Sequence, residues 1–313
     1  MDKPYKTYDE QVEILRNKGL EIPDKEKLIS LLKEHSYFGL VSGYKAPFKD
    51  SNKQYIQHTK IDDIYALYDF DAKLRALVLK YILKTENHIK SLLSYSFCNT
   101  YGDDQQQYLN VTNYDYSSPL NQSGINTLVS KLTAIVNNPE QYPYLAYQKN
   151  THQNIPLWAL SKALTLGTVS KMYSYLMQSV KQQISKEFDC VNDSQLVRMI
   201  DMLSRYRNVC AHNERLYDFK YNRGYISNTA VHKNLGIKKD RHGFYQCGRK
   251  DLFAVIIVLK YLLKESDFSM LCDELESILI ELSKNTRLIS YERILKEMGF
   301  PLNWYDIKTC NKA

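Results

Sequence analysis

With 313 residues, the chain is long enough to bury a substantial core and to form one or two domains. An apolar content of 44% and a charged content of 25% are ordinary for a globular protein and argue against extensive disorder. The formal net charge of +7 permits binding to phosphate groups without requiring it, because dedicated nucleic-acid-binding domains are usually more basic.

Several sequence features bear on the compartment of the protein. The start, MDKPYKTYDEQ, lacks the apolar core of a signal peptide. The longest purely aliphatic run, AVIIVL at 254–259, is too short to span a bilayer. The six cysteines form no CxxC pair and no regular spacing, which is typical of reduced thiols. We therefore expect a soluble, cytoplasmic protein with no membrane contact.

The first part of the chain shows mainly helical periodicity. The strongest segment is 61–98, where apolar residues recur at three- and four-residue steps. Shorter helices are predicted at 7–19, which opens with a capping signal, and at 24–37, which has leucines on one face. The stretch 38–56 is predicted to be a loop or a small irregular element, and 101–124 is predicted to be a loop, because glycine, proline or small polar residues dominate them.

Helical segments also fill most of the second part. The predicted helices are 125–137, 156–165, 168–190, 193–217, 251–265, 268–284 and 290–298, with a proline-punctuated linker at 137–156 and a basic loop at 219–250. Strand alternation is nearly absent and no internal repeat is evident. The sequence therefore predicts an all-α fold. We expect an N-terminal helical region over 1–60 and a helical domain over 61–313.

The predicted helix 193–217 places a charge among apolar residues. On an ideal helix, one apolar stripe is formed by Leu196, Ile200, Leu203 and Cys210. Arg207 falls in the middle of this stripe, where a guanidinium cannot simply be solvated. It must pair with a carboxylate or line a cleft that a phosphate enters.

His212 and Asn208 lie one turn apart on another side of the same helix, so Asn208 can bond the imidazole and fix its tautomer. An arginine and a histidine suit cleavage of a phosphodiester by an internal 2′-hydroxyl, a reaction that requires RNA. By spacing alone, the structural alternative is favoured: Arg207 pairs with a neighbouring helix, and His212 is a helix-end residue that favours the dipole.

Five segments together resemble a known family. RNVCAH resembles the Arg-Asn-x-x-Ala-His signature of HEPN-domain ribonucleases. The chain over roughly 5–220 resembles bacterial Abi-like abortive-infection proteins of the AbiD/AbiF type. The segments that carry the resemblance are YKTYDEQVEILRNKGLEI, LISLLKEHSYFGLVSGYKAPF, IDDIYALYDFDAKLRALVLKYILKTENHIKSLL, IPLWALSKALTLGTVSKMYSYL and RYRNVCAHNERLYD.

The resemblance implies a HEPN-like helical bundle with additional N-terminal and C-terminal helices. It implies a phage-defence toxin that cleaves RNA as a metal-independent endoribonuclease, without a cofactor. It also implies a homodimer, because HEPN enzymes commonly pair two motifs in one composite site and this chain carries one clear motif. A small structured RNA is an expected further partner. The catalytic residues implied are Arg207, Asn208 and His212.

For the remaining candidate residues, a purely structural role stays open as an alternative to a functional one. Glu86, or else Asp71, is expected to hold the motif arginine, although both also suit ordinary ion pairs four residues along the helix. Arg215 and Tyr217 lie beyond His212, where they contact substrate or only cap and pack. The basic loop presents three cations that suit RNA backbone or are merely solvated: Lys238, Lys239 and Arg241.

Two other functions compete with the nuclease. The first is a non-catalytic RNA-binding or regulatory protein that acts with a small structured RNA through the same basic surface. The second is a nucleotide-sensing module inside a larger complex. Only the nuclease hypothesis predicts that function depends on the imidazole of His212.

Overall fold

A computed structural model describes residues 4–313, which form helices and no β-strand; four isolated β-bridges are the only extended pairings among them. The predicted all-α fold is confirmed. None of the described helices is long and apolar enough to cross a membrane. The α-helices are Tyr8–Arg16 (α1), Lys25–His35 (α2), Ile61–Tyr101 (α3), Gln105–Leu109 (α4), Pro119–Asn137 (α5), Pro143–His152 (α6), Leu157–Ala163 (α7), Leu166–Tyr175 (α8), Gln178–Ser185 (α9), Asp193–Ala211 (α10), Ala230–Asn234 (α11), Leu252–Leu262 (α12), Glu265–Asn285 (α13) and Tyr291–Met298 (α14).

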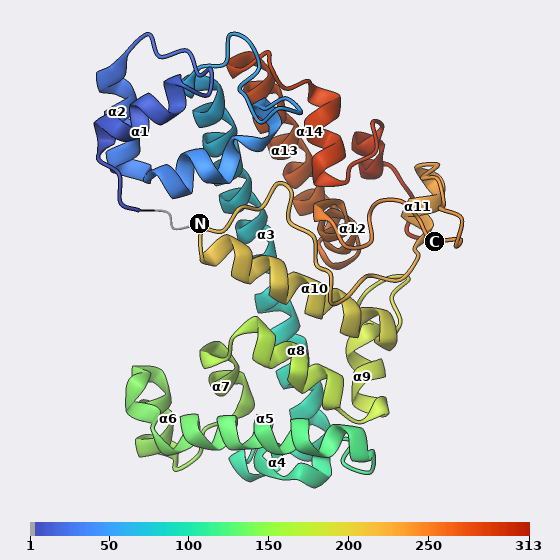
Figure 1. Cartoon of the computed structure of the whole chain (residues 1–313). Coiled ribbons are helices and arrows are strands. Elements are labelled where there is room, and N and C mark those ends of the chain that lie inside the picture. Colours follow the sequence, from blue (N-terminus) through green and yellow to red (C-terminus); the bar gives the residue numbers. More distant parts are fainter. Residues whose placement is uncertain (1–3) are drawn as a thin grey trace.

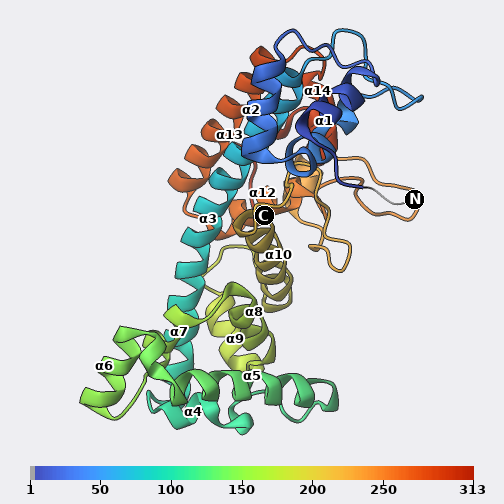
Figure 2. The same cartoon turned by 60° about the vertical axis from the view of Figure 1, so that its left-hand side comes forward.

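Helix α3 is the axis of the molecule. Its 41 residues span about 60 Å at the rise of an α-helix. In Figures 1 and 2, α1, α2, α13 and α14 surround its upper end, whereas α4 to α9 gather around its lower half. The buried apolar residues form a single cluster that runs from the N-terminal helices to the C-terminal segment. A domain boundary at residue 60 therefore stays a prediction.

Helix α10 crosses α3 near the middle of the molecule and packs against both α3 and α8 (Figure 1). It starts at a capping box in which Asn192 and Gln195 bond each other's backbone N–H groups. The prediction that this helix continues to residue 217 is wrong, because it ends at Ala211. Asn213 adopts the left-handed conformation (φ 56°), and the N–H of Glu214 bonds the carbonyl of Val209 at 3.0 Å. These are the features of a Schellman ending, which asparagine tolerates.

The prediction that 137–156 is a linker is also wrong, because this segment contains α6 and the 3-10 helix Pro139–Gln141. The prolines at 119, 139 and 143 occupy the first turns of helices, where the missing N–H has no intrahelical partner to lose. Proline therefore marks helix starts here rather than loops.

Smaller differences affect other predicted segments. The predicted loop 101–124 contains α4, the 3-10 helix Val111–Asn113 and the start of α5. The stretch 38–56, predicted to be a loop or a small irregular element, contains short helices over Tyr37–Ser42 and Ala46–Phe48. The predicted helix 168–190 is divided into α8 and α9.

The segment 219–250 contains α11 and is fastened by a buried histidine. His232 is fully buried; its Nδ1 accepts the N–H of Thr229 at 3.1 Å, and its Nε2 donates to the carbonyl of Gly248 at 2.9 Å. Its ring also stacks on Tyr245, with 4.7 Å between ring centroids. Burial lowers the pKa of His232, although the hydrogen bonds with Gly248 and Thr229 oppose this shift.

This burial predicts a loss of stability in acid. Because the unfolded imidazole takes up a proton near its ordinary pKa of about 6.5 and the folded one only at lower pH, acidification below that value favours unfolding. We expect the free energy of unfolding of the wild type to fall more than that of His232→Gln between about pH 7.5 and about pH 5.5. Urea unfolding at both pH values measures the difference, and an equal fall in both proteins would contradict it.

Candidate active site

Arg207 faces α3, as its place on the apolar stripe predicts. Its Nε lies 4.0 Å from Oε2 of Glu86, and the two side chains are 30% and 7% exposed. Neither of these two buried atoms has a hydrogen-bond partner among residues 4–313. Glu86, our first choice for the acidic partner of Arg207, therefore lies beside it in a loose ion pair without a hydrogen bond.

Glu86 also forms an ion pair with a second cation. Its Oε1 lies 2.7 Å from Nζ of Lys90, one turn further along α3, and this pair is almost fully buried. The cluster of Lys90, Glu86 and Arg207 thus combines two positive charges with one negative charge. An anion that reached the exposed part of Arg207 would balance the excess.

The pairing of Glu86 with two cations predicts a large effect of removing its charge. We expect Glu86→Gln to lower the free energy of unfolding by about 3 kcal/mol, because Lys90 and Arg207 would lose their shared counter-charge. The control is Glu281→Gln, which breaks an exposed pair with Lys73 and should cost less than about 1 kcal/mol. Urea unfolding compares the two variants. Equal effects would show that the cluster is an ordinary surface network.

His212 lies at the C-terminal end of α10. It is the residue that ends the helix, and its backbone N–H bonds the carbonyl of Asn208 at 2.9 Å. Both side chains are exposed, and within the described chain no hydrogen bond joins them. The structure therefore places Asn208 and His212 on one face without showing that Asn208 orients the imidazole. Arg207 and His212 lie about 140° apart around an ideal helix, so they point to different sides.

Asp71, the other predicted support for Arg207, has a different place. It is fully buried and accepts hydrogen bonds from the Tyr44 hydroxyl at 2.7 Å and from the N–H groups of Leu216 (3.1 Å) and Tyr217 (2.7 Å), beside an ion pair with Arg75. Burial raises the pKa of Asp71, against the effect of these partners. Asp71 thus fastens the segment after His212 to α3.

Arg215 and Tyr217 belong to this same fastened segment. Arg215 donates to Asp218 at 2.7 Å and to the carbonyl of Gly43. Tyr217 is 2% exposed and stacks on Tyr44 with 6.1 Å between centroids. The ring of Tyr217 is packed inside the protein, so we propose no substrate contact for it.

Lys238, Lys239 and Arg241 are exposed. They lie on a tight turn in which the N–H of Asp240 bonds the carbonyl of Phe244 at 2.7 Å. This turn offers positive charge to the solvent, as the sequence predicts, but it belongs to the segment 219–250 and not to the motif helix.

The sequence did not predict Tyr44, or the backbone N–H groups of Leu216 and Tyr217, as partners of Asp71. The pair of Asp71 with Arg75 is the ordinary ion pair four residues along the helix that the sequence allows. Tyr44 lies in a stretch predicted to be a loop or a small irregular element, and no local pattern links it to residues near 216, because these contacts arise only when α3 meets the end of the motif helix.

Comparisons with known proteins add one finding. A protein-family model described as Abi-like protein matches residues 30–218, more than half of the chain, and includes the whole of α3 and α10. No curated protein and no solved structure matches the chain. Within residues 4–313, no three side chains of His, Cys, Asp or Glu gather in a way that could hold a metal ion.

Proposed function

Because the chain belongs to the family of Abi-like proteins, which supports a role in phage defence by abortive infection, we propose that it acts by cleaving RNA. The observation that carries this proposal is the arrangement at the end of α10. Arg207 lies in a cluster with one excess positive charge, and His212, whose side chain is exposed, ends the same helix five residues later.

The proposed reaction uses the 2′-hydroxyl of the substrate as nucleophile. The imidazole of His212 takes the proton of this hydroxyl, the 2′-oxygen attacks the adjacent phosphorus, and the bond from phosphorus to the 5′-oxygen breaks. The leaving oxygen takes up a proton, so the products are a 2′,3′-cyclic phosphate and a 5′-hydroxyl. The guanidinium of Arg207 stabilises the extra negative charge on the phosphate during the transfer.

A second copy of the chain would complete this site. Since Arg207 and His212 point to different sides of one helix, a single chain does not direct both at one phosphate. Two α10 helices that meet near their C-terminal ends would bring the histidine of each copy toward the arginine of the other. The proposed enzyme is therefore a HEPN-like homodimer, with Glu86 holding Arg207 in each copy.

We expect the purified protein to be a dimer at micromolar concentration, with or without RNA, and to cut RNA in the presence of EDTA. Light scattering would then give twice the mass of one chain, and the cleavage rate per chain would fall on dilution as dimers dissociate. A monomer that cleaves RNA at an undiminished rate per chain would contradict the composite site. A protein without RNA cleavage in any state would contradict the nuclease.

The second candidate is an RNA-binding protein without catalysis, acting with a small structured RNA. The exposed turn with Lys238, Lys239 and Arg241 favours it, because these cations suit an RNA backbone. In that case glutamine at these three positions would remove phage defence, whereas His212→Ala would leave it intact.

A further inference from the structure

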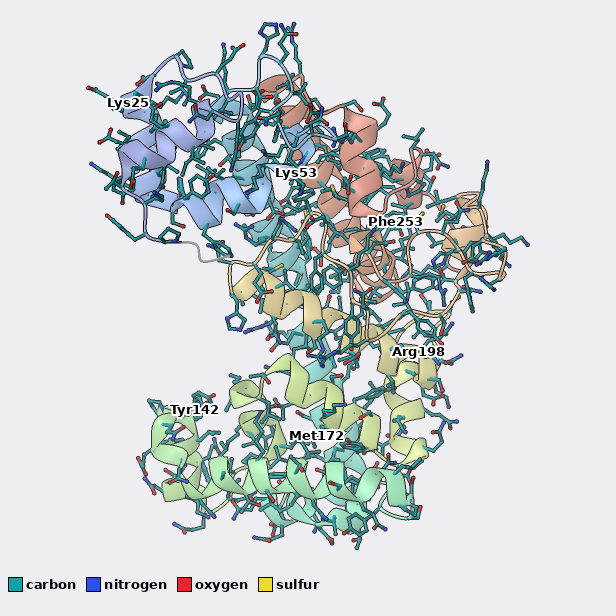
Figure 3. All side chains as sticks on the ribbon, in the orientation of Figure 1. Lys25, Lys53, Tyr142, Met172, Arg198 and Phe253 are labelled. Carbon is teal, nitrogen blue, oxygen red and sulfur yellow. The ribbon has the colours of Figure 1, made fainter. Side chains whose placement is uncertain are left out.

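One face of α10 carries a row of basic groups that ends at the candidate active site. Arg198, Arg205 and His212 are spaced seven residues apart, so they lie on one side of the helix at steps of about 10 Å. All three are exposed, and the row starts at Arg198, which Figure 3 labels. Asp201 lies on the same face, where its carboxylate accepts the hydroxyl of Tyr221 at 2.8 Å.

Aromatic rings from the segment 219–250 support these arginines. The guanidinium carbon of Arg198 lies 4.8 Å from the ring centroid of Tyr225, and that of Arg249 lies 4.7 Å from the same ring. Arg249 also lies 4.3 Å from the ring centroid of Phe244. A ring this close to a guanidinium attracts the cation and restricts its position, and Arg198 also donates a hydrogen bond to the hydroxyl of Tyr225.

A third arginine is held in the same manner. The guanidinium of Arg205 lies 5.6 Å from the ring of Tyr221, whose hydroxyl is bonded to Asp201. The aromatic residues of 219–250 thus contact α10 from Arg198 to Tyr206, whereas Asn208 and His212 beyond them are exposed.

The ion pairs of the described residues set these three arginines apart. Arg75 and Arg215 pair with aspartates, but within residues 4–313 no ion pair involves Arg198, Arg205 or Arg249. The Nε of Arg249 is moreover buried without a hydrogen-bond partner. Three guanidiniums held by aromatic rings and not engaged in an ion pair favour an anion, although Asp240, whose pKa is lowered mainly by backbone hydrogen bonds, lies near enough to Arg249 for that charge to lower it further. Their planar forks match the oxygens of phosphate groups.

We propose that Arg198, Arg205 and Arg249 form a track that binds the backbone of single-stranded RNA and leads it to His212. The spread of the guanidiniums over two helical turns fits a chain of phosphates better than one small anion. The choice of RNA rests on the proposed function, because the track ends at the residue that would cut it. Phe244 connects the track to the turn with Lys238, Lys239 and Arg241.

The test measures binding separately from cleavage. In the His212→Ala background, a fluorescent single-stranded RNA is titrated by anisotropy at several salt concentrations. Glutamine at Arg198, Arg205 and Arg249 should weaken binding by at least about tenfold and reduce the slope of log K against log salt by about 2. The control replaces Lys284, Arg287 and Lys296, which are exposed on the α13–α14 side of the molecule, and should change binding less than about twofold.

A second variant covers the case in which the triple variant folds poorly. Tyr225→Ala keeps every charge but removes the ring that both Arg198 and Arg249 contact, and should weaken binding by about fivefold with the salt slope unchanged. Equal losses of RNA binding in the triple track variant and the triple control variant would overturn the track. Unchanged RNA binding in both the triple track variant and Tyr225→Ala would overturn it as well. An oligoglutamate probe that binds as tightly as the RNA would overturn the choice of ligand.

The outcomes also separate this inference from the nuclease. If the wild type cuts RNA while the track variants bind RNA normally, the track fails and the nuclease stands. If the track variants lose RNA binding but the wild type cuts no RNA, the track stands and the nuclease fails.

Discussion

Replacing His212 with alanine is expected to lower the rate of RNA cleavage by at least about 10²-fold, because the imidazole is the proposed acceptor of the 2′-hydroxyl proton. The fold should be unaffected, since this side chain is exposed and forms no contact that the rest of the described chain depends on. RNA binding should likewise persist. Single-turnover cleavage in EDTA, together with growth after expression in bacteria, measures the loss of activity and of toxicity.

The matched control is His152→Ala, which removes an exposed histidine at the end of α6. This variant should cut RNA at the wild-type rate. If His212→Ala cuts RNA as fast as His152→Ala and is as toxic as the wild type, His212 is not catalytic. The hypothesis of an RNA-binding protein without catalysis is then favoured.

Asp71→Ala should have the largest effect on stability, about 3–5 kcal/mol in the free energy of unfolding. The substitution leaves Arg75 buried without its counter-charge. It also leaves the hydroxyl of Tyr44 and the N–H groups of Leu216 and Tyr217 without their acceptor. Because these N–H groups belong to the segment after His212, cleavage should fall together with stability. Urea unfolding gives the free energy.

Asp69→Ala is the comparison, since Asp69 lies on the same helix in an exposed pair with Lys73 and should cost less than about 1 kcal/mol. A similar small cost for both variants would show that the buried carboxylate does not fasten the segment.

The sequence predicts the parts of this structure that depend on local pattern. Apolar periodicity predicts α3 closely, and it places Arg207 on the α3 side of α10. Glu86 as its partner follows from the family resemblance combined with a carboxylate in α3. The seven-residue spacing of Arg198, Arg205 and His212 places them on one helix face, but no local pattern shows which rings contact the arginines.

The rest depends on interactions that local patterns do not encode. The end of α10 is decided by the left-handed conformation of Asn213, which competes with continued helical periodicity. The role of Asp71 depends on Tyr44, 27 residues earlier, and on backbone groups some 145 residues later. The contact of Tyr225 with Arg198 likewise depends on the fold of the segment 219–250. The sequence of this segment shows only that it is basic and contains aromatic residues.

The chemical ends of cleaved RNA test the central claim most directly. The wild-type protein is incubated in EDTA with a single-stranded RNA, and the fragments are analysed by mass spectrometry. Attack by the internal 2′-hydroxyl predicts a 2′,3′-cyclic phosphate on one fragment and a 5′-hydroxyl on the other. Fragments with a 3′-hydroxyl and a 5′-phosphate, or intact RNA after incubation with the wild type, would contradict the proposed chemistry at Arg207 and His212.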